Sequence, residues 1–296
     1  MTEQLHHGSP GEYRRTGALL GFLVKAEVDA IFKQQPFKTA EGEDPLELWR
    51  RFDQQRQTLA SVPAGQIEPL SASLRDVEAT IRQRKTYKQY YEAVADYVFG
   101  TAPIESLLAP QWFADLDYID ELAGKLTPDL AADEQLLFAL SEGTIHQPIV
   151  AGSQVLFTSP RRDLHADQVP AVRQIADGEF EIVVRAVSRP NYVQVATIGD
   201  RPLLTNGVHK VCALYKAGFT HCYCVSRPVH DLAETGLNVQ TSLFRDPIFK
   251  SPRPATVVDF LNSATAAPLY MRSMYQILQV AVTVGRMTAP ALPREP

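Results

Sequence analysis

The chain has 296 residues, of which 45 % are hydrophobic, and it carries a formal charge of -5 at pH 7. This length allows one large core or two smaller ones, and the acidic balance excludes a protein that coats nucleic acid through overall positive charge. No apolar run approaches the length of about 18 residues that a membrane-spanning helix needs, and the first residues lack the pattern of an export signal. We therefore expect a cytoplasmic protein with no membrane partner.

The first half of the chain is expected to be helical. Apolar residues recur at steps of three and four in several segments, which is the spacing of one helix face. The segments are 16–33, 46–59, 70–99, 104–126 and 127–143. We predict a helical region over residues 1–145, and this region offers a surface to a protein partner.

Charged side chains on two of these helices could have a binding role. Helix 70–99 has a basic stripe, which consists of Arg75, Arg82, Arg84, Lys85 and Lys88. Such a stripe can follow a phosphate backbone, but a charged helix face is more often solvated. Of the carboxylates Asp115, Asp117 and Glu121, only the last two share a helix face, and no third ligand stands at a fixed spacing. We favour solvated side chains in both places and predict no metal site.

The sequence pattern changes after Gly143. β-Branched and aromatic residues then cluster or alternate in short runs, which is typical of strands. The runs are 148–158, 179–187, 192–197 and 277–283. We predict a mixed α/β fold overall, with an α/β domain over residues 146–288 and a disordered, proline-rich tail over residues 289–296.

The segment 199–225 predicts a hairpin turn, a strand, a second tight turn, a helix and another strand in succession. Asn206-Gly207 forms the second turn, and Gly218 ends the helix. A helix that begins here has backbone N–H groups without partners and a partial positive charge at its first turn. An anion is the ligand that such a turn favours.

Five residues at this turn are candidates for holding a phosphate. Gly207 allows the backbone to approach a ligand closely, and Asn206 tolerates a left-handed conformation or caps the helix. His209 and Lys210 add a donor and a charge, and Thr205 stands at the end of the strand. A plain helix cap beside a sheet, with Lys210 solvated, stays open as the alternative.

The residues around this turn resemble the core motif of the superfamily that contains the ParB N-terminal domain and sulfiredoxin. The shared pattern is an apolar strand that ends in Asn206-Gly207, one variable residue, His209-Lys210, and a helix that ends at Ala217-Gly218. The upstream segment 159–164, SPRRDL, resembles the Pro-Arg element that follows the family's first strand. The resemblance is specific over residues 203–219, and it implies a small mixed sheet with helices and a nucleotide phosphate site.

The resemblance also implies site residues and activities. It adds Arg161 and Arg162 to the phosphate site, and it implies a nucleoside triphosphate with Mg²⁺ as cofactor and a nucleotide or nucleic acid as partner. His209 becomes the candidate catalytic residue for proton transfer in a phosphotransferase or nuclease. Val208 stands where sulfiredoxin has its catalytic cysteine, which excludes sulfinate repair. Lys210 replaces the usual arginine and would meet phosphate as a point charge.

A second function stays open, in which the motif is a scaffold in a non-catalytic module whose helical half recruits a protein or DNA. Val208 also replaces the glutamate of the CTP-hydrolysing partition proteins, which favours this alternative. The cysteines Cys212, Cys222 and Cys224 do not have the paired spacing of a zinc site or of a disulfide framework. We expect them to be reduced and buried in the core.

Overall fold

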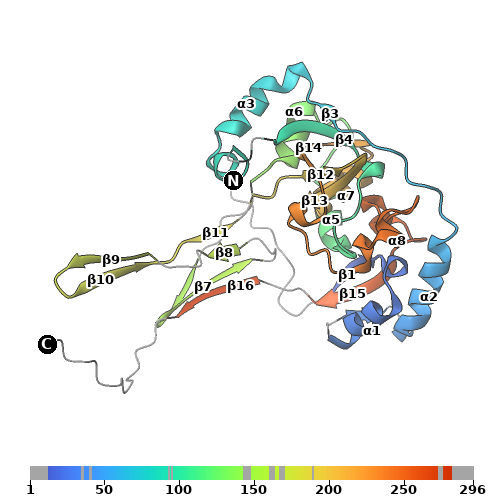
Figure 1. The fold of residues 1–296 in the computed structure, drawn as a ribbon, viewed down its shortest axis with the longest axis horizontal. Coiled ribbons are helices and arrows are strands. Elements are labelled where there is room, and N and C mark those ends of the chain that lie inside the picture. Colours follow the sequence, from blue (N-terminus) through green and yellow to red (C-terminus); the bar gives the residue numbers. More distant parts are fainter. Residues whose placement is uncertain are drawn as a thin grey trace. The chain divides into compact units, whose positions relative to one another are not determined.

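The computed structural model describes residues 13–34, 37–39, 42–92, 94, 96–142, 148–159, 164–166, 171–188, 190–272 and 276–281. The chain forms two compact units, and the first combines residues 1–143 with 190–273. The second combines residues 144–189 with 274–296. The fold is mixed α/β, as predicted (Figure 1). The predicted tail, residues 289–296, lies outside the described residues.

The first unit contains two sheets (Figure 1). One has the strand order β13-β12-β14-β4-β3, and the other has the order β2-β15-β1-β5. The strands of the former are β3 Glu68–Pro69, β4 Val98–Pro103, β12 Gln194–Ile198, β13 Arg201–Asn206 and β14 His221–Val229. Those of the latter are β1 Tyr13–Ala18, β2 Phe37–Thr39, β5 Phe113–Asp115 and β15 Ala267–Arg272.

The helices of this unit pack with both sheets around one core. They are α1 Lys25–Gln34, α2 Pro45–Arg56, α3 Arg75–Gln83, α4 Lys85–Tyr87, α5 Leu116–Ala123, α6 Ala132–Ala139, α7 Val208–Lys216 and α8 Asp246–Phe249. Local signals set where two of them begin. The Asp44 carboxylate accepts from the first backbone N–H groups of α2, and the Asp115 carboxylate accepts from Tyr118 N in α5 at 2.9 Å.

The predicted hairpin and helix near the Asn-Gly turn are confirmed. β12 and β13 pair in antiparallel fashion across the turn at Gly199, and α7 starts directly after Gly207. β14 then returns on the other side of β12, to which it is parallel. The helix α7 therefore connects the edge strand β13 to a central strand of the sheet.

The helix predicted over 16–33 is only partly correct. Its first residues form the strand β1, which pairs with β15 on one side and β5 on the other. Leu19, Leu20 and Phe22 are all almost completely buried, so this segment has no solvated face, and α1 begins only at Lys25. Pairing with distant strands overrides the local helical spacing here.

The helices predicted over 70–99 and 104–126 are also shorter than expected. The backbone of Arg84 is extended and ends α3, and Val98 begins the strand β4, which pairs with β14. In the second segment, β5 pairs with β1 before α5 begins. The predicted helical region thus contains strands whose partners lie far away in the sequence.

The second unit consists of small antiparallel sheets. A three-stranded sheet has the order β16-β7-β6, and two-stranded sheets join β9 with β10 and β8 with β11. The strands are β6 Ile149–Ala151, β7 Gln154–Ser159, β8 Leu164–Ala166, β9 Ala171–Ala176, β10 Glu179–Val183, β11 Ala186–Ser188 and β16 Gln276–Ala281. The strands predicted within 148–158, 179–187 and 277–283 are confirmed.

Candidate functional site

The predicted phosphate turn lies between β13 and α7, and its two polar side chains contact protein carbonyls. The Thr205 hydroxyl donates to Gln194 O at 3.1 Å. The Asn206 side-chain amide donates to Pro190 O at 3.2 Å. Both side chains therefore hold the turn against the segment that enters β12.

Gly207 has a left-handed backbone, with φ of 92°. A Cβ atom at this position would lie 2.9 Å from Cα of Val193, which is closer than packed atoms approach. The glycine is thus required by the close passage of residue 193 and by the backbone conformation. This requirement exists without any ligand.

Lys210 is buried, with 4 % of its surface exposed, and its ammonium group lies at the end of α6. It donates to Ser141 Oγ at 2.8 Å and to Ala139 O at 3.3 Å, and it also donates to Asn191 O. The last carbonyls of a helix lack partners within the helix and carry a partial negative charge. Lys210 therefore contacts the end of α6, and of the alternative only the part that left this lysine solvated is wrong.

His209 is half-buried against the start of α5. Its Nε2 atom accepts a hydrogen bond from Asp115 N at 3.2 Å, and its ring meets the Tyr118 ring edge-on, with centroids 5.2 Å apart. The Nε2 atom is therefore used within the protein in this arrangement. Arg161 and Arg162 lie outside the described residues, so the structure does not place them beside His209.

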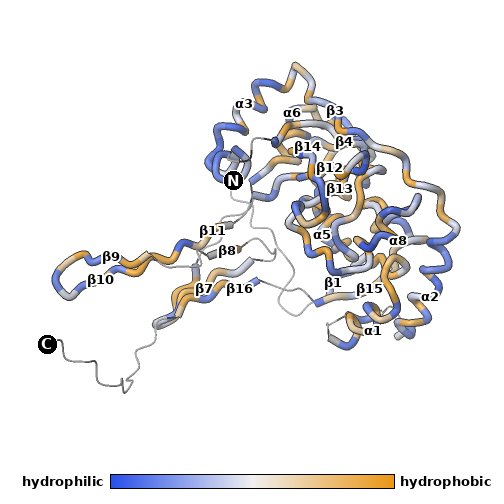
Figure 2. Tube along the Cα trace, in the orientation of Figure 1, coloured by the Kyte–Doolittle hydropathy of each residue, from blue (hydrophilic) through white to orange (hydrophobic). Residues whose placement is uncertain are grey.

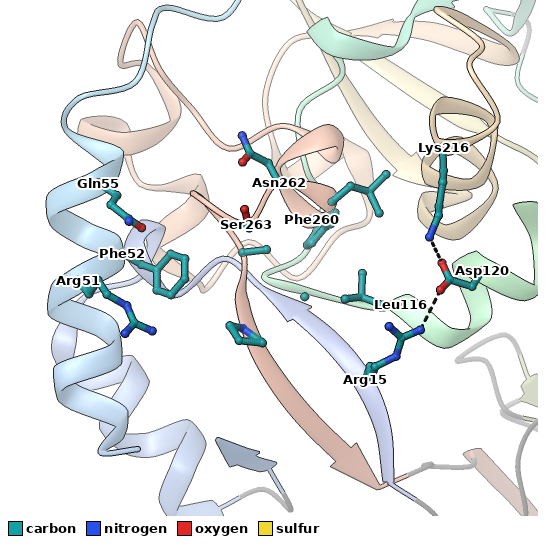
Figure 3. A pocket seen from close by; sticks show the side chains of 14 residues that line it. Arg15, Arg51, Phe52, Gln55, Leu116, Asp120, Lys216, Phe260, Asn262 and Ser263 are labelled. Atoms are coloured by element: carbon teal, nitrogen blue, oxygen red, sulfur yellow. Dashed lines mark hydrogen bonds and ion pairs between the residues drawn. The ribbon is translucent and has the colours of Figure 1, made fainter. Parts of the chain in front are cut away.

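A separate cavity lies near the other end of α7, and we call it the basic cavity (Figure 3). Its volume is about 520 Å³. Its walls come from β1, α2, α5, α7 and the segment that leads into β15. The residues that line it are Arg15, Gly17, Arg51, Phe52, Gln55, Leu116, Asp120, Lys216, Phe260, Leu261, Asn262, Ser263, Ala266 and Pro268.

Two of the three cations that line the basic cavity, Arg15 and Lys216, meet at Asp120 (Figure 3). Arg15 Nη2 lies 2.8 Å from one oxygen of this carboxylate, and Lys216 Nζ lies 2.5 Å from the other. Arg15 also pairs with Asp117, whereas Arg51 pairs with Glu43 at 2.8 Å. The three cationic side chains remain about half exposed, at 54 %, 48 % and 50 % for Arg15, Lys216 and Arg51.

The two cations keep the Asp120 carboxyl ionised. Burial acts to raise its pKa, but hydrogen bonds from Lys216 and Arg15 outweigh burial, and the pKa lies below the ordinary value. A carboxylate held in this way is a poor proton acceptor near neutral pH. Its role is to position the two cations.

The rest of the basic cavity is apolar and neutral polar. Phe52 and Leu116 supply apolar surface, while Asn262 and Ser263 line the cavity from the segment that leads into β15 (Figure 3). Gln55 lines the cavity from α2, and among the described residues its buried Oε1 atom has no hydrogen-bond partner. The cavity thus combines cationic, apolar and amide groups.

We compared the chain with protein-family models, with curated proteins and with solved structures. No match was found in any of the three comparisons. The resemblance to the ParB and sulfiredoxin superfamily therefore stays a prediction. Within the described ranges, no helix combines the length and apolar character needed to cross a membrane.

The carboxylates around α5 are paired with cations, although Asp117 and Glu121 stay 31 % and 39 % exposed, so the predicted solvated cluster is only partly correct. Arg14 is buried and lies 2.6 Å from Asp115 and 2.9 Å from Glu121, while Asp117 pairs with Arg15. The sequence does not reveal these partners, because β1 and α5 are about one hundred residues apart. In the part of the chain that the structure describes, no group of three His, Cys, Asp or Glu side chains could hold a metal ion.

Some side chains of the basic stripe predicted on helix 70–99 form contacts within the protein. Arg82 pairs with Glu78 at 2.7 Å, and Arg84 donates to Leu140 O at 2.7 Å. Arg75, by contrast, is exposed on α3. The stripe is therefore not one continuous solvated surface.

The three cysteines are buried, as predicted. Cys212 lies on α7, where its thiol donates to Val257 O at 3.4 Å, and Cys222 and Cys224 lie on β14. Burial raises the pKa of all three thiols, and that of Cys224 reaches about 12. They are therefore protonated and poorly nucleophilic near neutral pH.

Proposed function

We propose that this protein binds a small phosphorylated molecule, of the nucleotide class, in the basic cavity. The observation that carries this proposal is that three cationic side chains, Arg15, Arg51 and Lys216, line a cavity of about 520 Å³ with apolar walls. Small-molecule sites in proteins usually have volumes of about 300–1,000 Å³, mostly apolar walls and a few convergent polar groups. The basic cavity has each of these properties.

Phosphate fits the cationic side of the cavity. Guanidinium groups match the geometry of phosphate oxygens, and an ammonium group adds a point charge. Two cations, Arg15 and Lys216, meet a single carboxylate at Asp120, and all three cationic side chains are about half exposed. Ion pairs as exposed as these contribute only about 0–1 kcal/mol to the stability of the fold. An anionic ligand can therefore replace the ion-pair contacts of the cations at little cost.

A nucleoside fits the remaining surface. Leu116 and Leu261 can contact the apolar faces of a base, and Asn262 and Ser263 can exchange hydrogen bonds with a sugar. Gln55 holds an acceptor without a partner among the described residues, and a base or sugar can provide a donor after a small rotation of this side chain. A phosphorylated nucleoside uses all three kinds of group.

The proposal is for binding, and the predicted catalytic role of His209 in phosphate transfer or cleavage stays a prediction. The hydrogen bonds of Thr205, Asn206 and Lys210 to protein carbonyls favour a scaffold role for the motif. The order of hairpin, left-handed glycine, helix and strand supports the proposed likeness to the ParB and sulfiredoxin superfamily. The buried thiols are consistent with the proposed cytoplasmic location.

Calorimetric titration with adenosine, inorganic phosphate, AMP and ATP, with and without Mg²⁺, tests this function. We expect AMP or ATP to bind the wild type more tightly than adenosine or phosphate alone. Arg15→Gln and Lys216→Gln should each weaken that binding by about tenfold or more, because each removes one charge-assisted hydrogen bond of about 1.5–3 kcal/mol. Arg75→Gln, on the exposed face of α3, is the matched control and should bind as the wild type does.

His209→Gln separates the basic cavity from the predicted turn. We expect this variant to bind nucleotide normally, since His209 does not line the cavity. Loss of binding in His209→Gln, with Lys216→Gln unaffected, would move the site to the Asn206-Gly207 turn. No heat with any of the four compounds would contradict nucleotide binding altogether. Unfolding temperatures of all variants check that each is folded.

A further inference from the structure

Large apolar side chains are exposed mainly in the second unit. Of the eleven that are exposed among the described residues, eight belong to residues 144–189 and 274–296. Five of these lie on the hairpin β9–β10, whose strands contain hydrophobic stretches (Figure 2), and they are Val172, Ile175, Phe180, Ile182 and Val183. Soluble monomers seldom expose apolar groups in such clusters unless the surface binds something.

One face of the hairpin carries its three most exposed apolar side chains. In the antiparallel register Val172 lies opposite Ile182, and Phe180, two residues from Ile182, lies on the same face. These three side chains are 63–64 % exposed. The other face carries the ion pair between Arg173 and Glu181 together with the apolar side chains of Ile175 and Val183. The pattern is that of a short piece of sheet that further strands can extend.

The edges of the hairpin are also open. In the part of the chain that the structure describes, β9 and β10 pair only with each other, and every residue of β9 is exposed. A two-stranded ribbon is only marginally stable in water, whereas three or more strands with an apolar face are stable. Open backbone groups along an edge are a template for a further strand.

The charges of the two strands decide which edge can accept a second copy. β10 carries Glu181, which pairs with Arg173, and also Glu179, whose charge lies outside this ion pair, so two antiparallel β10 strands would bring the Glu179 charge near a second carboxylate, which is destabilising. β9 carries only Arg173, whose charge is met by Glu181 across the hairpin. Two β9 strands can therefore pair without opposing two unpaired charges.

We infer that the protein forms a dimer in which β9 pairs in antiparallel fashion with β9 of a second copy. The product is a four-stranded sheet in the order β10-β9-β9-β10, with Val172, Phe180 and Ile182 of both copies on one continuous face. Such a contact uses the same surface on both copies, so it closes at two and does not extend into a filament.

Light scattering after size exclusion, over a dilution series, tests the dimer. The wild type should have twice the mass of the 32.9 kDa chain at high concentration and dissociate on dilution. Val172→Lys should be monomeric throughout. Val98→Lys is the matched control, because Val98 is an exposed strand valine of the first unit, at 54 %, and it should behave as the wild type does.

A wild type that stays monomeric at every concentration would overturn the inference, and the apolar hairpin would then need a different partner. Equal dissociation in Val98→Lys and Val172→Lys would also overturn it. Circular dichroism of both variants confirms that they are folded.

Cysteine cross-linking tests the edge. The natural thiols are buried, so a single cysteine placed on the hairpin is the reactive one. Mild oxidation should link copies that carry Val172→Cys or Gln174→Cys on β9, and much less those with Glu179→Cys or Glu181→Cys on β10. Preferential linking through β10, or no linking at all, would contradict β9 pairing.

Discussion

At the scale of single residues, burial separates the structural role of one lysine of α7 from the proposed binding role of another. Lys210 and Lys216 carry the same charge on α7. The first is 4 % exposed and contacts the end of α6, whereas the side chain of the second is 48 % exposed and contacts Asp120 in the basic cavity. The motif lysine therefore belongs to the fold, and the lysine outside the motif belongs to the proposed ligand site.

Replacement of each lysine by methionine should separate these roles. Lys210→Met removes the donor that the oxygen atoms of Ser141 and Asn191 share, and we expect the free energy of unfolding to fall by about 1–3 kcal/mol. Lys216→Met removes a partly exposed ion pair and should lower the free energy of unfolding by about 0–1 kcal/mol. Urea unfolding followed by circular dichroism gives both values. A stable Lys210→Met protein that no longer binds nucleotide would instead support the predicted phosphate turn.

At the scale of elements, α5 is held to its neighbours by ion pairs. Arg15 on β1 and Lys216 on α7 both contact Asp120, and Arg14 on β1 contacts Asp115 and Glu121. The sequence predicts α7 and the hairpin before it, because the turn residues and the apolar spacing are local signals. It cannot predict that β1 and β5 are strands, since their pairing partners are distant in the chain.

These ion pairs predict an acid-sensitive contribution to stability. The pKa of Asp120 is lower in the folded protein than its ordinary value of about 3.9. Its contribution is therefore fully present above about pH 4 and is lost as the pH falls through the lowered pKa. We expect the difference in urea midpoint between wild type and Asp120→Asn to be largest at neutral pH and to shrink below pH 4. A difference that does not change with pH would contradict this assignment.

At the scale of the whole molecule, the core of the first unit is built from both ends of the chain. β1 near the start pairs with β15 near the end, and the thiols of α7 and β14 lie in the core between segments from both halves. Access to these thiols therefore requires this unit to open. Their raised pKa values further lower the thiolate fraction.

Alkylation of the three cysteines should therefore depend on opening of the first unit. We expect iodoacetamide at neutral pH to react slowly with all three cysteines of the folded protein and rapidly with all three in denaturing urea. Mass spectrometry of the labelled protein counts the modified thiols. One cysteine that reacts rapidly without urea would mean that α7 or β14 opens locally.

Sequence and tertiary structure determined different properties of this protein. The sequence by itself determined the Asn206-Gly207 turn, the helix that follows it, several strands and the burial of the cysteines, because these depend on local turn chemistry, spacing and hydrophobicity. Only the tertiary structure decided that Lys210 contacts α6 and that Arg15, Arg51 and Lys216 line one cavity. These residues are separated by tens to hundreds of positions, and their proximity depends on strand pairing and packing that no local pattern specifies.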